Sequence, residues 1–301
     1  MSRPVKQLLA WCQLLRIGNV FTAASNVIAG FLIAQGGWQP VGPLLVLIAA
    51  SALLYVAGMV LNDAFDAERD ATEHPERPIP SGRISRRTAF VVGWTLLAVG
   101  CLVAIIAANL VNNMRPAIAA GALALCIVGY DAGLKSTFLG PWTMGTCRLL
   151  NVMLGVYGTS DAWLPDTLLY AVLVGLYTVG VTYFARTENE QGCDWNQYIG
   201  SVMVLATTFC ASIWAGRATG DLLLVFINGS ILFLFIWCDR GWFTAGPATP
   251  SILRGRVRRM ILGFIVMDAV MVYATVGWQP AVVLLSLLLP TWIASRFAPM
   301  T

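Results

Sequence analysis

The sequence predicts an all-α, polytopic membrane protein. Of its 301 residues, 58% are hydrophobic and only 11% are charged, and the mean hydropathy of +0.73 excludes an ordinary soluble domain. Apolar stretches of roughly 17–22 residues recur along the chain, and each is long enough to cross a hydrocarbon core of about 30 Å. We therefore expect nine transmembrane helices, and a weaker apolar stretch at 280–295 leaves a tenth open. The nine lie near residues 17–35, 41–61, 89–110, 117–134, 142–158, 166–185, 198–215, 221–238 and 258–277.

The composition does not change along the chain, so residues 1–301 are expected to form a single membrane domain. The N-terminal segment carries Arg3, Lys6 and Arg16 but no small-residue cleavage site, which indicates an uncleaved first helix. The seven cysteines form no C-x-x-C pair, which argues against a thiolate metal site and against a disulfide framework.

Basic residues predict the orientation, because cytoplasmic loops of membrane proteins carry an excess of lysine and arginine. With the N-terminus inside, the outer loops hold only Arg115 and Arg217, and the inner loops hold most of the other basic residues. We therefore expect an integral membrane protein whose N-terminus and polar loops face the cytoplasm. The inner loops would be 62–88, 135–141, 186–197 and 239–257.

The most polar stretch is 62–83, directly behind an apolar run. Asp63, Asp66 and Asp70 stand at i, i+3 and i+7, so a helix would place them on one face, where they repel unless a cation lies among them. Oxygen ligands of this kind suit Mg²⁺, which usually bridges to substrate phosphates. Arg77 follows with a planar fork for phosphate oxygens, and Asn62 stands beside the aspartates. This predicts a magnesium–diphosphate site; the alternative is a solvated loop that only sets topology.

A second acidic group lies in the loop R-T-E-N-E-Q-G-C-D at 186–194. Glu188 follows the end of a predicted helix, and Glu190 and Asp194 are four residues apart, so they could share a helix face. All three are candidate metal ligands, and Arg186 is a candidate substrate-binding residue. A solvated charged loop is again the alternative.

Further polar residues stand within or beside apolar helices. Lys135, at an inner helix end, either contacts phosphate or extends its side chain to the interface. Arg148 and Asn151 share one face of an apolar helix, and an arginine there is costly unless it faces a cavity or a partner. We expect them in a cavity wall shared with the substrate. Asp268 is a functional candidate in mid-helix without an evident partner, and Asn26 is a candidate for helix–helix hydrogen bonding.

These motifs resemble those of the UbiA superfamily of intramembrane prenyltransferases. The order Asn62-Asp63…Asp66…Asp70 matches that family's N-D-x-x-D-x-x-x-D, and the continuation R-P-I-P-S-G-R-I-S also matches. Tyr130 and Lys135 resemble its Tyr/Lys motif after the fourth helix. The second motif departs from the usual D-x-x-x-D, because glutamates stand there. The segments A-R-T-E and C-R-L-L-N suggest a divergent bacterial branch close to EboC-like members.

The resemblance implies nine helices around a central, lipid-open cavity in a bacterial inner membrane. Two acidic motifs would hold Mg²⁺ and the diphosphate of an isoprenoid donor, whose ionisation gives an allylic cation. An unidentified aromatic or lipid acceptor would capture that cation. The implied metal ligands are Asp63, Asp66, Asp70, Glu188, Glu190 and Asp194. The implied catalytic residues are Asp63, Asp66, Asp70, Glu188 and Lys135, and the implied substrate-binding residues are Asn62, Arg77, Tyr130, Arg148, Asn151 and Arg186.

Three functions stay open at this point. The first is a magnesium-dependent prenyltransferase, in which bound cations stabilise the charge that develops on the departing diphosphate. The second is a membrane terpene cyclase, which uses the same ionisation but captures the cation within its own chain. The third is a non-catalytic lipid-binding or assembly subunit, which would tolerate loss of the acidic residues. The expected partners are an isoprenoid diphosphate, the acceptor and membrane lipids, with no nucleic acid.

Overall fold

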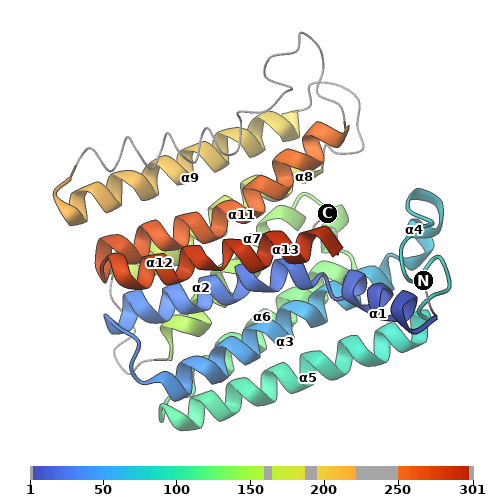
Figure 1. The fold of residues 1–301 in the computed structure, drawn as a ribbon, viewed down its shortest axis with the longest axis horizontal. Coiled ribbons are helices and arrows are strands. Elements are labelled where there is room, and N and C mark those ends of the chain that lie inside the picture. Colours follow the sequence, from blue (N-terminus) through green and yellow to red (C-terminus); the bar gives the residue numbers. More distant parts are fainter. Residues whose placement is uncertain (1–2, 159–164, 187–194, 222–249, 298–301) are drawn as a thin grey trace.

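A computed structural model describes residues 3–158, 165–186, 195–221 and 250–297 of the chain (Figure 1). The elements in these ranges are helices, as the composition predicts. They are α1 (Arg3–Leu14), α2 (Ile17–Gln35), α3 (Val41–Phe65), α4 (Ala67–Glu73), α5 (Arg86–Leu110), α6 (Arg115–Ala132), a 3₁₀ turn (Leu134–Ser136), α7 (Gly140–Val156), α8 (Pro165–Ala185), α9 (Trp195–Thr219), α11 (Pro250–Thr275), α12 (Trp278–Ser286) and α13 (Leu288–Phe297).

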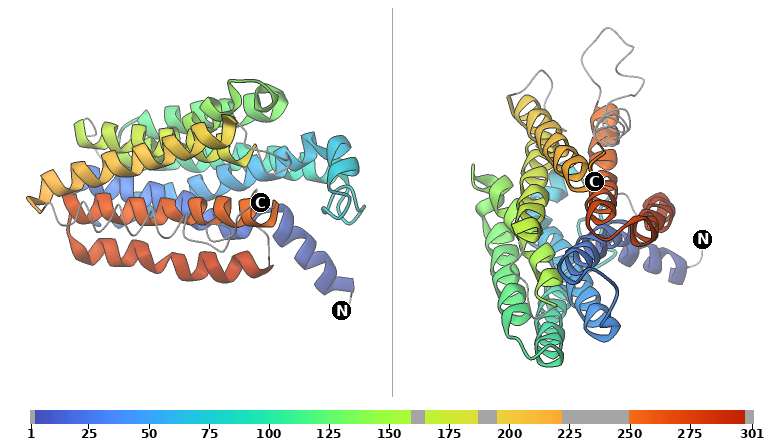
Figure 2. Two further views of the ribbon diagram at one scale, coloured as in Figure 1. Left: turned by 90° about the horizontal axis from the view of Figure 1, so that it is seen from above. Right: turned by 90° about the vertical axis from the view of Figure 1, so that its left-hand side faces the viewer.

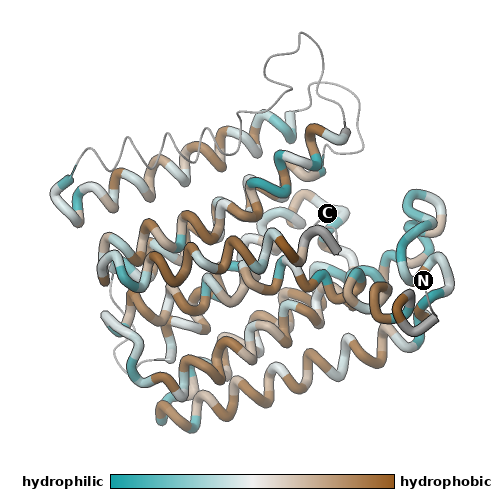
Figure 3. The backbone as a smooth tube through the Cα atoms, viewed as in Figure 1, coloured by the Kyte–Doolittle hydropathy of each residue, from teal (hydrophilic) through white to brown (hydrophobic). Residues whose placement is uncertain are grey.

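The long helices run along a common direction, which is horizontal in Figure 1, and α4 projects from one end of the bundle. The end-on view in Figure 2 places α5 and α6 on the opposite side of the bundle from α12 and α13. The most extensive contacts join α3 to α5, α8 to α9, α7 to α8 and α2 to α7. Hydrophobic residues cover most of the helices, and hydrophilic ones gather at α4 and at the first turns of α11 (Figure 3).

Six stretches within the described ranges are long and apolar enough to cross a membrane, which confirms an integral membrane protein with an all-helical fold. They are Gln7–Gln35, Val41–Phe65, Arg86–Leu110, Arg115–Ala132, Pro165–Ala185 and Trp195–Thr219. The expected fifth stretch is the 17-residue helix α7, and the expected ninth is the later part of α11. The weaker tenth is divided between α12 and α13. The stretch at 221–238 lies almost entirely outside the described residues.

Local sequence signals set the helix boundaries. Gly36, with φ 72°, ends α2 in the left-handed conformation that glycine adopts without strain, and its N–H caps the carbonyl of Leu32. The hydroxyl of Ser85 accepts a hydrogen bond from the backbone N–H of Thr88 and so caps α5. Proline stands in the first turn of both α6 and α7, where its missing N–H costs nothing.

Small residues let α2 and α7 cross closely at the centre of the bundle. A Cβ atom added at Gly155 would overlap the carbonyl oxygen of Val27, and one at Gly30 would lie 2.6 Å from the carbonyl oxygen of Val152. Close backbone approach of this kind is how membrane helices gain packing without a hydrophobic driving force. The crossing brings the polar side chains of α2 against α7.

The largest apolar core is built around α8, which presents buried aromatic rings to α2, α7 and α11. Tyr170, Tyr177 and Phe184 on α8 are fully buried. The hydroxyl of Tyr177 donates to the carbonyl of Met260 at 2.8 Å, so this aromatic ring keeps a hydrogen bond inside the core. A second core joins α3, α5, α6 and α7 and forms the other wall of the bundle interior.

Candidate active site

The acidic motif lies at the end of the bundle from which α4 projects. Helix α3 ends at Phe65 and α4 begins at Ala67, so Asp66 stands at a break between two helices. The expected single helix with three aspartates on one face is therefore interrupted. Asp63 lies in the last turn of α3 and Asp70 lies in α4, and both are buried.

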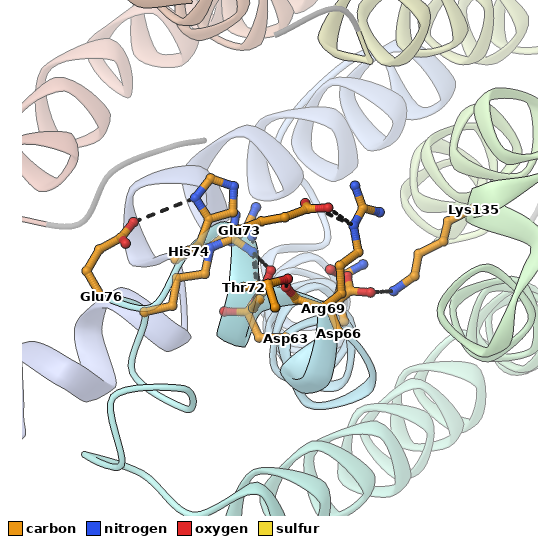
Figure 4. A network of polar contacts seen from close by, with 12 residues as sticks. Asp63, Asp66, Arg69, Thr72, Glu73, His74, Glu76 and Lys135 are labelled. Atoms are coloured by element: carbon orange, nitrogen blue, oxygen red, sulfur yellow. Dashed lines mark hydrogen bonds and ion pairs between the residues drawn. The ribbon is translucent and has the colours of Figure 1, made fainter. Parts of the chain in front are cut away.

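Each aspartate of the motif faces a basic residue from a different part of the chain. Oδ1 of Asp66 lies 2.7 Å from the Nζ of Lys135, which stands in the 3₁₀ turn after α6 (Figure 4). One guanidinium nitrogen of Arg77 donates to both carboxylate oxygens of Asp70, at 2.8 Å each. The predicted site residues Asp66, Arg77 and Lys135 are far apart in sequence, but the fold brings them together at this end of the bundle.

Asp63 pairs with Arg16, which the sequence indicated only as an N-terminal charge. The Nη2 of Arg16 lies 3.2 Å from Oδ1 of Asp63. Arg16 occupies the junction of α1 and α2 with φ 42° and ψ 49°, a left-handed conformation that is uncommon outside glycine. Such strain persists where tertiary contacts hold it, and it is frequent at functional sites. No sequence spacing could have linked positions 16 and 63.

The remaining acidic residues of α4, Glu68 and Glu73, are exposed and form ion pairs at the surface, Glu73 at the edge of the cleft described below. Glu73 accepts two hydrogen bonds from Arg69 at 3.0 Å, and Glu68 pairs with Arg86 at 2.6 Å. The hydrogen bond from Arg69 lowers the pKa of the Glu73 carboxyl. Pairs as exposed as these contribute little to stability.

A polar cleft of about 470 Å³ opens at this end of the bundle. Its walls bring together α3, α4, the 3₁₀ turn and the end of α8. Arg186 fixes the turn, because its Nη2 donates to the backbone carbonyls of Lys135 and Thr137 at 2.8 and 2.7 Å. The cleft is lined by the predicted residues Asn62, Asp66, Asp70, Arg77, Tyr130, Lys135 and Arg186, together with Arg16, Arg69, Glu73, His74, Ser136, Thr182 and Ala185.

A narrower cavity of about 70 Å³ lies beside the cleft, within the helices. Asn62 and Tyr130 line both spaces, so they form the boundary between them. The rest of the cavity wall is mostly apolar, and it includes Arg148 and Asn151, as predicted. The other lining residues are Tyr55, Gly58, Met59, Leu123, Ile127, Asp131, Met144 and Cys147.

Helix α2 holds the two predicted polar residues of α7. The guanidinium of Arg148 donates to Oδ1 of Asn26 and to the hydroxyl of Thr22, each at 2.9 Å. Its Cζ also lies 4.7 Å from the ring centre of Phe264, within cation–π range. The amide of Asn151 donates to the carbonyl of Ala23 at 2.9 Å. Both residues are therefore held in place before any substrate binds.

Asp268, for which the sequence offered no partner, lies in the centre of a buried network. Its carboxylate accepts hydrogen bonds from Ser25 at 2.6 Å, from Tyr170 at 2.6 Å and from the amide of Asn26 at 2.9 Å. Asn26 in turn accepts from Arg148. The network links α2, α7, α8 and α11, and it confirms Asn26 as a helix–helix hydrogen-bonding residue. Asp268 itself lines neither the cleft nor the cavity in the described part of the chain.

Asp131 is a site residue that sequence reasoning missed. Asp131 lies between Tyr130 and Lys135 in the sequence, where the motifs indicated no role for it. Its side chain is buried and lines the apolar cavity. The amide of Asn62 donates to its Oδ1 at 2.9 Å. The signal in the sequence was an ionisable residue in the last turn of an apolar helix, which is a functional candidate by default.

The second predicted motif is not part of the described structure. Glu188, Glu190 and Asp194 all lie outside the described residues, so their metal-binding role stays a prediction. Among the residues that the structure covers, no three histidines, cysteines, aspartates or glutamates converge closely enough to hold a metal ion. The carboxylates of the first motif instead contact basic side chains.

The sequence of this chain matches a known protein family over most of its length. Residues 23–237 match the model of the UbiA prenyltransferase family. The chain belongs to the UbiA family. As a UbiA prenyltransferase it is an enzyme, and the all-helical membrane fold predicted from its composition and apolar stretches is confirmed.

Within the UbiA family, the chain is similar to digeranylgeranylglyceryl phosphate synthases. The chain is 32% identical to the digeranylgeranylglyceryl phosphate synthase of Saccharolobus solfataricus, over 67% of this chain and 69% of that protein. It is 29% identical to the enzyme of the same name from Methanoregula boonei, over 79% and 81% of the two chains. These relatives are archaeal synthases, so the expected kinship with the EboC-like branch is not supported.

Solved structures confirm the UbiA-like fold. A solved structure of a digeranylgeranylglyceryl phosphate synthase in membranes superposes with a TM-score of 0.62, at 17% identity, over 90% of this chain and 99% of that one. A UbiA homologue from Archaeoglobus fulgidus, bound to DMAPP and Mg²⁺, gives a TM-score of 0.55 at 14% identity, over 92% and 99% of the two chains. At these identities the likeness concerns the fold alone.

Proposed function

We propose that this UbiA protein transfers an isoprenoid group from a prenyl diphosphate to a hydroxyl group of a prenylated glycerol phosphate lipid, in a magnesium-dependent reaction. The names of the relatives support this acceptor, because a digeranylgeranylglyceryl phosphate is a glycerol phosphate that carries two isoprenoid chains. The Archaeoglobus fulgidus homologue supports the donor class, since it binds the prenyl diphosphate DMAPP together with Mg²⁺.

One structural observation carries the proposal: a polar, cation-rich cleft and an apolar cavity share the side chains of Asn62 and Tyr130. A prenyl diphosphate has the same division, because a charged head is joined to a hydrocarbon chain at a single carbon. The head fits the cleft, where Arg77 and Lys135 supply positive charge. The bond that breaks would then lie at the boundary, next to Asn62 and Tyr130.

The residues of the first motif have the donor chemistry that suits Mg²⁺, and the three carboxylates would have to move closer together than they lie in the described structure to hold one ion jointly. Asp63, Asp66 and Asp70 offer carboxylate oxygens only, which is the donor type that Mg²⁺ prefers, and Asp66 and Asp70 open onto the cleft. We propose these three as ligands, with Glu188, Glu190 and Asp194 contributing from the second motif. When bound there, Mg²⁺ neutralises the charge that builds on the departing diphosphate.

The basic residues of the cleft have two alternative partners. Lys135 and Arg77 pair with aspartates when the cleft holds no donor. If the aspartates held Mg²⁺, Lys135 and Arg77 would be free to bind the diphosphate oxygens, and arginine matches such oxygens with its planar fork. Lys135, Arg77, Tyr130 and Asn62 thus surround the leaving group. Tyr130 and Asn62, which stand between the cleft and the cavity, separate the charged diphosphate in the cleft from the apolar cavity.

Two further proposals concern the orientation of the protein in the membrane and its domain organisation. We propose that the N-terminus and the cleft face the cytoplasm, because basic residues concentrate in the loops at that end. We also propose that residues 1–301 act as one catalytic domain. The cleft is lined by residues from distant parts of the chain, from Arg16 before α2 to Arg186 after α8.

Product analysis tests the function. Purified protein in lipid vesicles is supplied with Mg²⁺, geranylgeranyl diphosphate and a glycerol phosphate bearing one geranylgeranyl ether, and products are identified by mass spectrometry. We expect a second ether and free diphosphate. Asp66→Asn should abolish both, whereas Glu68→Gln, which removes an exposed carboxylate two residues away, should leave both intact. A cyclic hydrocarbon formed without acceptor would indicate a terpene cyclase instead, and ether formation only with aromatic acceptors would contradict the lipid acceptor.

A further inference from the structure

Asp131 carries an unusual carboxylate for a residue between membrane helices. Its side chain is 96% buried, since only 4% of its surface is exposed, and it contributes to the wall of the apolar cavity. Oδ1 accepts the hydrogen bond from Asn62, but Oδ2 has no hydrogen-bond partner within the described structure. No basic side chain in the described ranges lies within 4.0 Å of this carboxylate.

A buried carboxylate oxygen without a partner is costly, and native proteins keep few of them without a functional reason. Nearby basic groups are already engaged elsewhere. Lys135 lies one turn further along the chain but pairs with Asp66, and Arg148 across the cavity donates to Asn26 and Thr22. Asp131 is therefore oriented by Asn62 yet retains one acceptor oxygen for a donor that the protein itself does not supply.

The position of Asp131 relative to the bond-breaking boundary indicates what that donor is. Asn62, which holds Oδ1, lines both the cleft and the cavity, and Tyr130 beside Asp131 does the same. Asp131 lines only the cavity. It thus stands on the side of the boundary where the prenyl carbon and the acceptor meet, and away from the diphosphate.

We propose that Asp131 is the catalytic base that takes the proton from the acceptor hydroxyl. The inference rests on the proposed function, because it needs an alcohol as the nucleophile. The carbon–oxygen bond of the donor breaks and its electron pair leaves with the diphosphate. The acceptor oxygen forms the new carbon–oxygen bond to the allylic carbon, and its proton passes to Oδ2 of Asp131. The products are an ether, diphosphate and a protonated Asp131, which later returns the proton to solvent.

The other groups around the cavity are less suited to this step. Asp131 is the sole carboxylate that lines the cavity in the described part of the chain. Tyr55, Tyr130 and Cys147 also line it but are neutral donors in their ordinary protonation states, and Arg148 is a cation. The carboxylates of the cleft contact basic side chains on the far side of Asn62. The one competing base is the departing diphosphate, and the experiment distinguishes it.

The test compares wild-type protein with Asp131→Asn and Asp131→Glu in the vesicle assay. Loss of a positioned base typically costs 10²–10⁴-fold in rate. We expect kcat for ether formation to fall on the order of 100-fold in Asp131→Asn, with the KM of the acceptor unchanged. Donor ionisation should persist and divert to geranylgeraniol through capture by water. Asp131→Glu should recover part of the rate, because it restores a carboxylate.

An acceptor analogue in which a thiol replaces the hydroxyl separates a chemical role from a structural one. A thiol loses its proton far more readily than an alcohol, so it needs little help from a base. Asp131→Asn should therefore transfer to the thiol at a rate within a few-fold of wild type. The decisive quantity is the rate with the thiol acceptor divided by the rate with the alcohol acceptor. Both rates are measured on the same preparation of one variant, so their ratio does not depend on how much of that variant folds.

Three outcomes overturn the assignment. An unchanged rate of ether formation in Asp131→Asn would make the departing diphosphate the base. An equal loss with alcohol and thiol acceptors would reduce Asp131 to a positioning residue for Asn62. If wild-type protein forms no ether from any alcohol, the proposed function fails as well, and that result is visible before any variant is made.

Discussion

The Nζ of Lys135 lies 2.7 Å from Oδ1 of Asp66, so the turn that follows α6 reaches across to the break between α3 and α4. The contact joins the acidic motif to a lysine 69 positions later and closes one wall of the polar cleft. Because Lys135 is only partly exposed, its charge acts in a medium of lower dielectric than water. A donor diphosphate in the cleft would therefore meet a cation that is already in place.

Lys135→Met should weaken use of the prenyl diphosphate. A hydrogen bond to a charged group contributes about 1.5–3 kcal/mol, so kcat/KM for the donor should fall roughly 10- to 150-fold. Steady-state kinetics at saturating acceptor measure this loss. Arg87→Gln is the matched control, because Arg87 is exposed at the start of α5 and does not line the cleft, so it should behave as wild type. An equal loss in both variants would point to general surface charge.

Mg²⁺ and inorganic pyrophosphate should stabilise the protein together more than either does alone. The aspartates already have partners within the chain, so a chelator should leave the apparent Tm nearly unchanged. Ligands at 100 times their Kd stabilise the folded state by about 2.7 kcal/mol. Thermal unfolding in detergent, monitored by fluorescence, measures the shift. A large loss of Tm on chelation alone would show that the metal has a structural role instead.

Asp268→Ala should destabilise the protein far more than Tyr170→Phe. The alanine variant leaves the donors Ser25, Asn26 and Tyr170 without their acceptor, and each buried donor left unsatisfied costs about 1–3 kcal/mol. The phenylalanine variant removes one donor from a carboxylate that keeps two others, at about 1–3 kcal/mol. Unfolding by denaturant in mixed micelles gives both values. Equal effects would contradict the shared-acceptor network.

Gly155→Val should disturb the crossing of α2 and α7. Its side chain would overlap the backbone of Val27, and overpacking of this kind costs about 1–3 kcal/mol or forces the helices apart. Since Arg148 lies two turns earlier on α7, prenyl transfer should fall as well. Gly121→Val, also within a membrane helix but with open space around it, serves as the control and should keep both stability and activity.

The sequence predicted those parts of the site that follow local rules. The spacing from Asn62 to Asp70 identified the acidic motif, and an arginine at 148 in an apolar helix indicated a cavity wall. It did not predict the break at Asp66, because the spacing of the aspartates suits one continuous helix and no glycine or proline marks the point where α3 ends and α4 begins. Partners across the fold were also beyond its reach: Arg16 for Asp63 and Asn62 for Asp131 depend on helices packed side by side.

The Arg148–Asn26–Asp268 network also bears on how the chain enters the bilayer. Chains are made from the N-terminus, so α2 and α7 are both present before α11 is synthesised. Both hydrogen-bond partners of Arg148, Asn26 and Thr22, lie on α2 and are therefore synthesised before α7. Asp268 arrives last and meets donors that the earlier helices have already arranged. The acceptor at the centre of this network is thus the last of its members to be synthesised, and all of its donors lie earlier in the chain.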